Sequence, residues 1–300
     1  MMGKRIEFEQ ITRLDPEWVR EHIARFMAED TPNGDVTTEA IVTELTPVAA
    51  KMVAVDDFVF CGAQVIPYCF PESCSVKIFC SDGDSVSSGQ SFAEIRGSAV
   101  LILTHERVAL NLIQKLCGIS SEIKKYCDLD LPENFKVMDT RKTTPGLRRF
   151  EKYAVAVGGG WNHRLDLSTG ILIKDNHLKA TGSVKTAVER SRKQNMKNLP
   201  IELEVDTLEQ LKEGLELDVD GILLDNMSTE MVKEAVSIIR DSPGGDAIFV
   251  EASGGINYKA LESYAWTGID GVSMSTITAQ VSPVDIKLEL MKEKNYIKIL

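Results

Sequence analysis

Two patterns of hydrophobic and polar positions divide the chain. Between Ala49 and Ile102, short β-favouring runs alternate with turn sequences such as Ser81–Asp84 and Ser87–Gln90. From Phe135 onward, apolar runs of strand length alternate with amphipathic helical segments, with a repeat of roughly 20–30 residues. The first pattern predicts an α+β region with an antiparallel sheet. The second predicts βα units and therefore a parallel sheet, open or closed into a barrel.

The first region is expected to contain two substantial helices. Asp15 suits an N-cap and Pro16 the first helical turn, and the turn cluster Thr31–Asp35 ends this helix. A longer helix is expected from Thr104 towards Gly118, because its apolar residues recur at helical spacing. The strands expected here are Ala50–Val55, Ser75–Phe79 and Phe92–Arg96, with a short helix over Cys61–Tyr68.

The strands expected in the second region share one feature, which is an apolar run that ends in a charged or glycine-rich turn. They are Phe135–Asp139, Gly170–Lys174, Ile201–Val205, Gly221–Asp225, Ile248–Glu251 and Gly271–Met274. The helices expected between them are Ser183–Asn195, Thr207–Glu216, Ser228–Asp241 and Asn257–Thr267. Because ligands bind at the carboxyl ends of parallel strands, we expect the polar residues there to form one site.

Composition narrows the choice of ligand. The chain has 300 residues, a net charge of −11 and a pI of about 5.0, which argues against binding nucleic acid or an anionic membrane. Its apolar runs are too short to span a bilayer. The six cysteines match no zinc spacing, and with no signal peptide at the start we expect reduced thiols in a cytoplasmic protein. Basic residues concentrate between Arg141 and Lys174, which favours a small anionic ligand.

The strongest chemical signal is the stretch Val137–Arg149, which reads V-M-D-T-R-K-T-T-P-G-L-R-R. Its apolar start is typical of a buried strand, and Pro145 suits the first turn of the following helix. The basic residues therefore fall on a loop between strand and helix, where a ligand would bind. A solvated basic loop is the alternative. The cations are Arg141, Lys142, Arg148 and Arg149.

Carboxylates end two successive strands at Glu204 and Asp225. Facing carboxylates raise each other's pKa, so we expect hydroxyls, Mg²⁺ or lysine to hold them. A ribose diol and a magnesium pyrophosphate would satisfy both, whereas structural pairing with Lys174 or Lys142 is the alternative. Glu202 shares the strand face of Glu204 and could substitute for it. Ser253, Gly254 and Gly255 precede a helix, an arrangement that suits phosphate.

A second basic pair, His163 and Arg164, follows the glycines Gly158–Gly160, which we expect to form a loop flexible enough to fold over a ligand. With Arg141 and Lys174, this pair suits a ligand that carries more than one carboxylate, because arginine binds carboxylates bidentately. Lys174 opens the run I-K-D-N-H over Ile173–His177. Asp175 and His177 either orient Lys174 or cap the next turn.

Taken in order, these motifs resemble the quinolinate phosphoribosyltransferase family, also called carboxylating nicotinate-nucleotide pyrophosphorylase. The resemblance extends from Gly34 to about Thr278, and its most specific motif is D-T-R-K-T-T-P-G-L-R. The motifs are Glu106–Asn111 (E-R-V-A-L-N), Asp139–Arg148, Lys152–Val155 with Gly158–Gly160, His163-Arg164 and Ile173–His177.

The resemblance implies an α/β protein with an N-terminal α/β sandwich built on an antiparallel sheet and a C-terminal open α/β barrel of parallel strands. We expect residues 1–114, joined by 277–300, to form the sandwich, and residues 115–276 to form the barrel that carries the active site. The implied reaction converts quinolinate and phosphoribosyl pyrophosphate to nicotinate mononucleotide, pyrophosphate and CO2, with Mg²⁺, in de novo NAD biosynthesis. A cytoplasmic homodimer with a shared active site is implied, and further assembly into a hexamer is left open.

The resemblance also implies roles for individual residues. Quinolinate would be held by Arg107 of the partner subunit and by Arg141, His163, Arg164 and Lys174. The phosphoribosyl substrate would be held by Lys142, Glu204, Asp225, Ser253, Gly254, Gly255 and Ser275. Lys142, Lys174, Glu204 and Asp225 would be catalytic, stabilising charge as the bond to pyrophosphate breaks. No metal ligand is assigned to the protein, since Mg²⁺ would arrive on the pyrophosphate, with water between it and Glu204 or Asp225.

Three positions depart from the family pattern. Ser275 and Ala279 stand where glycine and histidine are usual, which puts phosphate contacts from that loop in question, and Asp206 replaces a common glutamate. Two other functions were weighed. One is the molybdate-operon homologue of the family, which acts on a different substrate but tends to lack I-K-D-N-H. The other is a catalytically silent binding protein, which would not need both Glu204 and Asp225.

Overall fold

The computed structural model describes residues 6–42, 46–217 and 219–291, and these form two compact units. The barrel unit consists of residues 6–10, 125–148 and 160–280. The sheet unit consists of residues 11–124, 149–159 and 281–291 within the described ranges. The hydrophobic pattern did not indicate that residues 6–10 join the barrel unit or that 149–159 join the sheet unit. The domain limits expected at 114 and 277 stay a prediction, since compactness alone does not define an independently folding domain.

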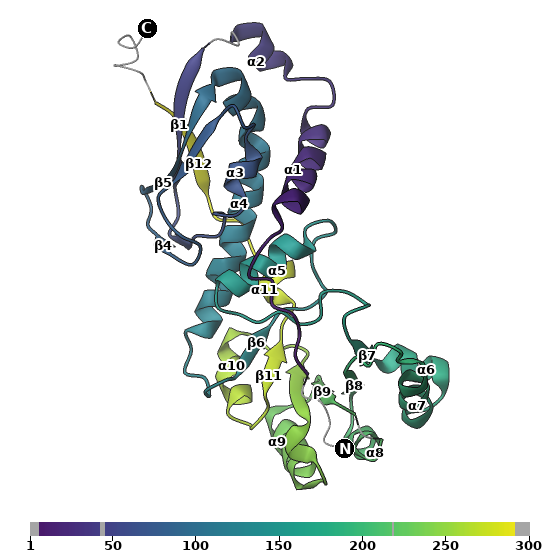
Figure 1. The fold of residues 1–300 in the computed structure, drawn as a ribbon. Coiled ribbons are helices and arrows are strands. Elements are labelled where there is room, and N and C mark those ends of the chain that lie inside the picture. The colour runs from purple at the N-terminus through teal and green to yellow at the C-terminus, as the bar shows by residue number, and fades with distance from the viewer. Residues whose placement is uncertain (1–5, 43–45, 218, 292–300) are drawn as a thin grey trace. The chain divides into compact units, whose positions relative to one another are not determined.

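The sheet unit is built on four antiparallel strands in the order β12-β1-β5-β3. Its strands are β1 (Pro47–Ala54), β3 (Ser75–Ile78), β5 (Ser91–Ser98) and β12 (Ile286–Leu290), with a small ribbon of β2 (Phe58–Val59) and β4 (Ser85–Val86). The late strand β12 pairs with β1, so that Met52 lies opposite Leu288 (Figure 1). The antiparallel sheet predicted for this region is confirmed.

Helices of the sheet unit begin and end for local reasons. The N-cap carboxylate of Asp15 accepts the Trp18 backbone N–H at 2.8 Å, as its position before Pro16 predicted. The short helix expected over Cys61–Tyr68 is limited to four residues. The helices are α1 (Pro16–Asp30), α2 (Val36–Ile41), α3 (Ile66–Cys69), α4 (Ala99–Cys127) and α5 (Arg148–Val157).

Two helix boundaries were predicted wrongly. α4 begins at Ala99 rather than Thr104 and passes through Gly118, where an added Cβ would lie 2.5 Å from the Ser282 carbonyl oxygen. This glycine therefore permits close packing instead of ending the helix. Pro145 precedes α5, because Thr144 accepts the Leu147 N–H at 3.0 Å across a turn whose third residue, Gly146, has φ +84°. Proline followed by a positive-φ glycine is the signature of a type II turn.

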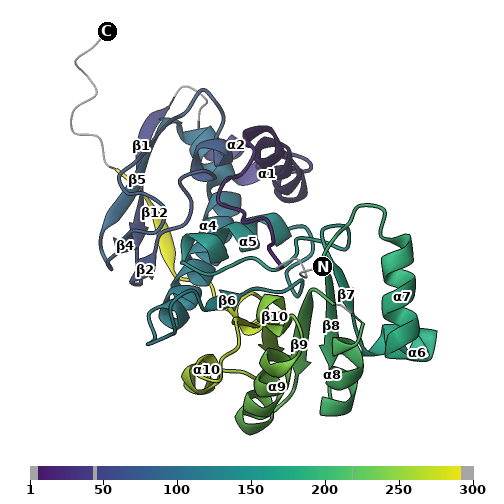
Figure 2. The same cartoon turned by 60° about the horizontal axis from the view of Figure 1, so that its bottom comes forward.

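The barrel unit contains six parallel strands in the order β6-β11-β10-β9-β8-β7. Edge strands β6 and β7 pair only on one side, so the barrel is open, as predicted. Figure 2 shows α8 and α9 beside the strands that they connect. The strands are β6 (Lys136–Met138), β7 (Ile171–Ile173), β8 (Ile201–Val205), β9 (Gly221–Asp225), β10 (Phe249–Ser253) and β11 (Gly271–Ser273).

Helices follow the barrel strands in the predicted order, each with a polar N-cap at its start. Ser183, Thr207 and Ser228 accept backbone N–H groups through their hydroxyls at the first turns of α7, α8 and α9. The helix over Asp175–Thr181 was not expected. The helices are α6 (Asp175–Thr181), α7 (Val184–Gln194), α8 (Leu208–Leu215), α9 (Thr229–Asp241), α10 (Tyr258–Ala265) and α11 (Thr276–Ala279), with a 3₁₀ turn over Gly245–Ala247.

The free edge of β6 is occupied by the segment around Trp161. The Trp161 N–H donates to Val137 at 2.9 Å, and the Asp139 N–H donates to Trp161 at 3.0 Å, which forms a single parallel bridge. Beneath it, Ile6, Met138 and Phe249 form a buried apolar cluster. No helix in the described part of the chain is long and apolar enough to cross a membrane.

Candidate active site

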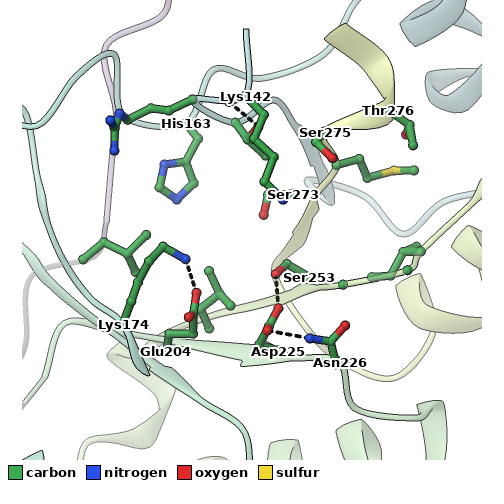
Figure 3. A pocket seen from close by; sticks show the side chains of 18 of the residues that line it. Lys142, His163, Lys174, Glu204, Asp225, Asn226, Ser253, Ser273, Ser275 and Thr276 are labelled. Atoms are coloured by element: carbon green, nitrogen blue, oxygen red, sulfur yellow. Dashed lines mark hydrogen bonds and ion pairs between the residues drawn. The ribbon is translucent and has the colours of Figure 1, made fainter. Parts of the chain in front are cut away.

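One cavity of about 660 Å³ opens at the carboxyl ends of the six parallel strands, wholly within the barrel unit (Figure 3). Every predicted site residue except Arg107 lines it. These residues are Arg141, Lys142, His163, Arg164, Lys174, Glu204, Asp225, Ser253, Gly254, Gly255 and Ser275. The prediction that polar strand ends gather at one place is therefore confirmed, although the roles of the residues stay predictions.

Arg107 lies on α4, in the sheet unit, and its side chain is exposed. The cavity is described within the barrel unit alone. Its assignment to the site of a partner subunit stays a prediction.

The loop after β6 presents only two of its four cations to the cavity. Arg141 is half-buried, and its Nε is fully buried without a hydrogen-bond partner among the described residues. Lys142 is exposed at the cavity wall, and its carbonyl accepts the Thr278 hydroxyl at 2.9 Å. Arg148 instead braces the loop, donating from Nε to the Thr143 hydroxyl at 3.0 Å, and Arg149 lies over the Trp18 ring in the sheet unit. A buried donor without a partner suits an anionic ligand.

Glu204 and Lys174 form an ion pair across the cavity wall, between the ends of β8 and β7 (Figure 3). Glu204 is 7% exposed. Burial raises the pKa of Glu204, the hydrogen bond from Lys174 lowers it, and the charge of Asp225 raises it again, with a net upward shift. The alternative of pairing with Lys174 is thus realised for Glu204. A ligand that withdrew Lys174 would leave this carboxylate in need of a new partner.

The residues after Lys174 cap α6 and do not orient its side chain. His177 accepts the Lys174 backbone N–H on Nδ1 at 2.8 Å. Asp175 pairs with Lys179 at 2.7 Å, one helical turn later. Of the two explanations for the run I-K-D-N-H, capping is the one that the structure supports.

Asp225 is oriented by hydrogen bonds at both oxygens. Its Oδ1 accepts the Ser253 hydroxyl at 2.7 Å, and its Oδ2 accepts the Asn226 side-chain amide at 2.6 Å. Asn226 also donates its backbone N–H to the Ser253 carbonyl at 2.9 Å. At Gly254, where φ is +92°, a Cβ would lie 2.2 Å from Asn226 Oδ1, so glycine is required. These contacts join the ends of β9 and β10 into one rigid edge of the cavity.

The glycine-rich turn leads into α10, whose N-cap is Asn257. Asn257 Oδ1 accepts the backbone N–H groups of Lys259 and Ala260 at 3.0 and 3.3 Å. These helical donors are therefore already satisfied. The phosphate contact predicted at Ser253, Gly254 and Gly255 stays a prediction, and it would have to use the turn itself.

His163 and Arg164 lie in the opening between β6 and β7, and both are buried. His163 Nε2 is 3.3 Å from Glu202 and 3.5 Å from Glu251. Burial lowers the pKa of His163, but the charges of Glu251 and Glu202 outweigh it and raise the pKa to about 10. Arg164 donates from Nη1 to the Gly170 carbonyl at 2.9 Å, which ties it to the start of β7.

Two further expectations were wrong. Glu202 cannot substitute for Glu204, because it is 1% exposed, does not line the cavity and faces His163. The run Gly158–Gly160 is not a mobile cover. Gly158 packs so closely in the sheet unit that a Cβ would lie 2.3 Å from Ile123 and 2.4 Å from the Ser120 carbonyl oxygen.

Sequence reasoning missed three residues that shape the site, which are Asn226, Glu251 and Thr278. Asn226 could have been found, because it directly follows the strand-end Asp225. Glu251 also stands at a predicted strand end, but its apolar neighbours gave no indication that it faces a histidine. The contact of Thr278 with Lys142 spans 136 residues and has no local signal.

The two walls of the cavity suit different parts of one ligand. Lys142 and His163 lie on one side, with Glu204, Asp225 and Ser253 on the other (Figure 3). The cationic side can hold carboxylates, and the carboxylates can accept hydroxyl groups or face a bound cation. Glu204 and Asp225 offer the hard oxygen donors that magnesium prefers, so their chemistry fits the expected ion, which stays a prediction.

Comparisons with known proteins agree with this arrangement. Family models described as quinolinate phosphoribosyl transferase match residues 35–117 for the N-terminal domain and 119–289 for the C-terminal domain. A probable nicotinate-nucleotide pyrophosphorylase (carboxylating) of Bacillus subtilis is 38% identical over 268 residues, covering 88% of this chain and 91% of the relative. The corresponding Mycobacterium leprae protein is 38% identical over 277 residues, covering 90% and 96%.

Solved structures give the same result. That of the nicotinate-nucleotide pyrophosphorylase from Francisella tularensis superposes with a TM-score of 0.86 at 31% identity, covering 95% of this chain and all of the other. The structure from Ehrlichia chaffeensis gives 0.83 at 36% identity, covering 90% and 98%.

The raised pKa of Glu204 predicts how its amide variant responds to pH. Glu204 has a higher pKa in the folded state than in the unfolded state. Its contribution to the stability of the folded protein is therefore lost as pH rises from the unfolded pKa through the folded pKa. Glu204→Gln should therefore have a higher Tm than the unchanged protein at pH 7.5, with the difference shrinking towards pH 4. Thermal unfolding over this range measures it. Exposed Glu209→Gln serves as the control, and equal Tm differences at both pH values would contradict the account.

Proposed function

We propose that this chain, which belongs to the quinolinate phosphoribosyltransferase family, converts quinolinate and phosphoribosyl pyrophosphate to nicotinate mononucleotide, pyrophosphate and CO2. The observation that carries the proposal is the cavity itself, where cations for a diacid and carboxylates for a ribose face each other. Its place would be the formation of a pyridine nucleotide in NAD biosynthesis.

Quinolinate would occupy the cationic side. Arg141 offers a buried Nε that has no partner among the described residues, and Arg164 and Lys174 flank the same cavity. Burial and the neighbouring charge of Arg141 lower the pKa of Arg164, which means that the two cations repel each other when the cavity holds no anion. A dicarboxylate would relieve that repulsion, and this supports a ligand with two acidic groups.

The phosphoribosyl substrate would lie between the carboxylate side and Lys142, which faces it from the cationic side (Figure 3). Glu204 and Asp225 would accept hydrogen bonds from ribose hydroxyls, while Lys142, Ser275 and the Ser253–Gly255 turn would contact phosphates. Ser275 has a hydroxyl where the family pattern has glycine, so it can still donate to a phosphate oxygen. The hydrogen bonds that orient Asp225 support this placement, because they fix the carboxylate before the substrate arrives.

The reaction then follows from position and charge. The pyridine nitrogen forms a bond to the anomeric carbon while the carbon–oxygen bond to pyrophosphate breaks, and pyrophosphate keeps the electron pair. Glu204 and Asp225 stabilise the positive charge that develops on the ribosyl carbon, and Lys142 stabilises the leaving group. The cationic ring nitrogen accepts the electrons as the adjacent carbon–carboxylate bond breaks, CO2 departs, and the ring carbon takes a proton from water.

Magnesium belongs to the proposal as a companion of the pyrophosphate. It would neutralise the leaving group's charge when bound, with water between it and the two carboxylates. Glu204 and Asp225 face the same cavity and bear like charges, which supports a cation between them and the phosphates.

A homodimer is proposed, in which Arg107 of one subunit completes the cavity of the other. Its support is that the Arg107 side chain is exposed and can therefore reach another subunit. Assembly into a hexamer is left open. A cytoplasmic location is proposed because all six cysteines are free thiols. None of the comparisons above favours the molybdate-operon homologue.

Arg141→Ala should lower kcat/KM for quinolinate by ~10²–10³, because it removes a preorganised charge from the ligand. Steady-state formation of nicotinate mononucleotide measures it. Lys179→Ala is the matched control, since it removes an exposed cation near the cavity that pairs only with Asp175 in its described contacts. Turnover of Arg141→Ala close to that of the control would reject the assignment.

The shared site can be tested by mixing two inactive variants. In a hybrid dimer of Arg107→Ala and Arg141→Ala subunits, one cavity has both arginines and the other has neither. Random reassortment should therefore restore about a quarter of the unchanged activity, as two-fold symmetry requires. The activity of a mixture after mild dissociation and reassembly measures this. Activity that stays at the level of the separate variants would mean that Arg107 does not act across a subunit boundary.

A further inference from the structure

Three titratable side chains meet inside the barrel unit, directly beneath the cavity. His163 Nε2 lies 3.3 Å from Glu202 on β8 and 3.5 Å from Glu251 on β10. All three are buried, with exposed fractions of 4%, 1% and 0%. His163 lies within ion-pair distance of both carboxylates, and the charge of Arg164 also acts on Glu202. Burying two carboxylates beside one imidazole costs desolvation free energy, which other interactions of the folded protein must offset.

The two ring nitrogens of His163 have different neighbours. Nε2 faces the two glutamates, and Nδ1 accepts the Arg164 backbone N–H at 2.8 Å. The ring also stacks on Phe8, with centroids 4.4 Å apart and planes inclined by 30°. Below it, the Asp139 carboxylate accepts the His163 backbone N–H at 2.9 Å. The imidazole is thus fixed in place and orientation by contacts that do not involve a ligand.

The neighbours of the ring have opposite effects on whether Nδ1 carries a proton. Glu202 and Glu251 favour the imidazolium, whereas the bond from the Arg164 N–H needs a lone pair on Nδ1. Both situations leave a proton on Nε2, between the carboxylates. Asp139 and Arg164 also face His163 from the adjoining segments. We therefore expect a proton on Nε2 whether the ring is neutral or charged.

The same three side chains have the composition of a metal site, and their ligand atoms lie within 4.8 Å of one another. A histidine that binds a metal normally donates its other ring N–H to a neighbour. His163 does the reverse, since its second nitrogen accepts a hydrogen bond from Arg164. The geometry therefore suits a shared proton better than a metal ion.

We propose that Glu202 and Glu251 are positioning residues, which hold a proton on Nε2 of His163 and thereby make this histidine a fixed support for Arg164. The support continues through Arg164, whose guanidinium donates to the Gly170 carbonyl at 2.9 Å. His163 and Arg164 thus link the residue after β6 and the interiors of β8 and β10 to Gly170, just before β7. This support keeps Arg164 at a position where the cationic side of the cavity can bind two carboxylates. That role rests on the proposed function.

The first test needs no variant. With ¹⁵N-labelled histidine, the signal of His163 among the four histidines is identified by its loss in His163→Asn. Long-range ¹⁵N–¹H spectra of the ligand-free protein should show Nε2 protonated throughout pH 6–9. Adding quinolinate without its co-substrate should leave the protonation of both ring nitrogens unchanged. Loss of the Nε2 proton near pH 6.5, the ordinary histidine pKa, would overturn the proposal.

The second test uses Glu202→Gln, Glu251→Gln and the double variant, which keep the side-chain size and relieve the repulsion between the buried carboxylates. In the double variant only the Arg164 N–H still favours a proton on Nε2, so the imidazolium should be lost at a lower pH and the ¹⁵N signal of Nε2 should shift. Quinolinate binding, measured by calorimetry, should weaken about tenfold or more, the scale of one hydrogen bond to a charged group. Binding of magnesium pyrophosphate should stay within about twofold, because the other wall of the cavity is intact.

Glu151→Gln is the matched control, since it changes another fully buried glutamate, on α5 in the sheet unit. It should leave the His163 signals and quinolinate binding unchanged. Unaltered His163 signals in the double variant, or a stoichiometric metal lost with Glu251→Gln, would overturn the proposal. If the unchanged protein does not bind quinolinate, the proposed function fails, while the ligand-free spectra still decide whether the glutamates hold the histidine.

Discussion

Charge burial inside the open barrel is the constraint on which the site depends. Asp139, Glu202 and Glu251 are almost fully buried, and each is held by a contact with the segment that contains His163. A carboxylate removed from water must be paired or hydrogen-bonded, or it destabilises the fold. Because β6 and β7 leave an opening between them, this segment can enter and provide those partners. The opening in the barrel thus admits the basic residues of the site, and these residues contact the buried carboxylates.

The parallel strands form a cavity that has a cationic side and a carboxylate side. Polar residues at the strands' carboxyl ends and the loop before β7, which contains His163 and Arg164, thus become neighbours although they are far apart in the sequence. Turns and caps then fix their directions, as Thr278 does for Lys142 and Asn226 does for Asp225. A reaction that depends on position and charge needs this rigidity, because groups oriented in advance stabilise a transition state without reorganising.

Local signals predicted much of this architecture. The cap at Asp15, the parallel strands and the gathering of their polar ends follow from spacing and propensity, and they were confirmed. The errors arose where tertiary contacts overrule local preference. Gly118 stays within α4 because the Ser282 backbone lies against it, and Pro145 makes a turn because Gly146 follows it.

Other features have no local signal at all. Glu202 and Glu204 share a strand face, yet one contacts His163 and the other Lys174. Nothing in their spacing distinguishes them, because the difference depends on how far each lies below the strand end. The same holds for Glu251, which contacts His163 because β10 and the segment after Trp161 both lie inside the barrel. Depth in the barrel decides which carboxylate lines the cavity and which lies in the interior.

The central claim is that the cationic wall selects a ring with two carboxylates. The most direct measurement is a discontinuous assay of product formed from phosphoribosyl pyrophosphate and Mg²⁺ with quinolinate, and in parallel with nicotinic acid, which has one carboxylate. The account predicts nicotinate mononucleotide and CO2 from quinolinate alone. Equal or faster product formation from nicotinic acid, or no product from either acid, would contradict it.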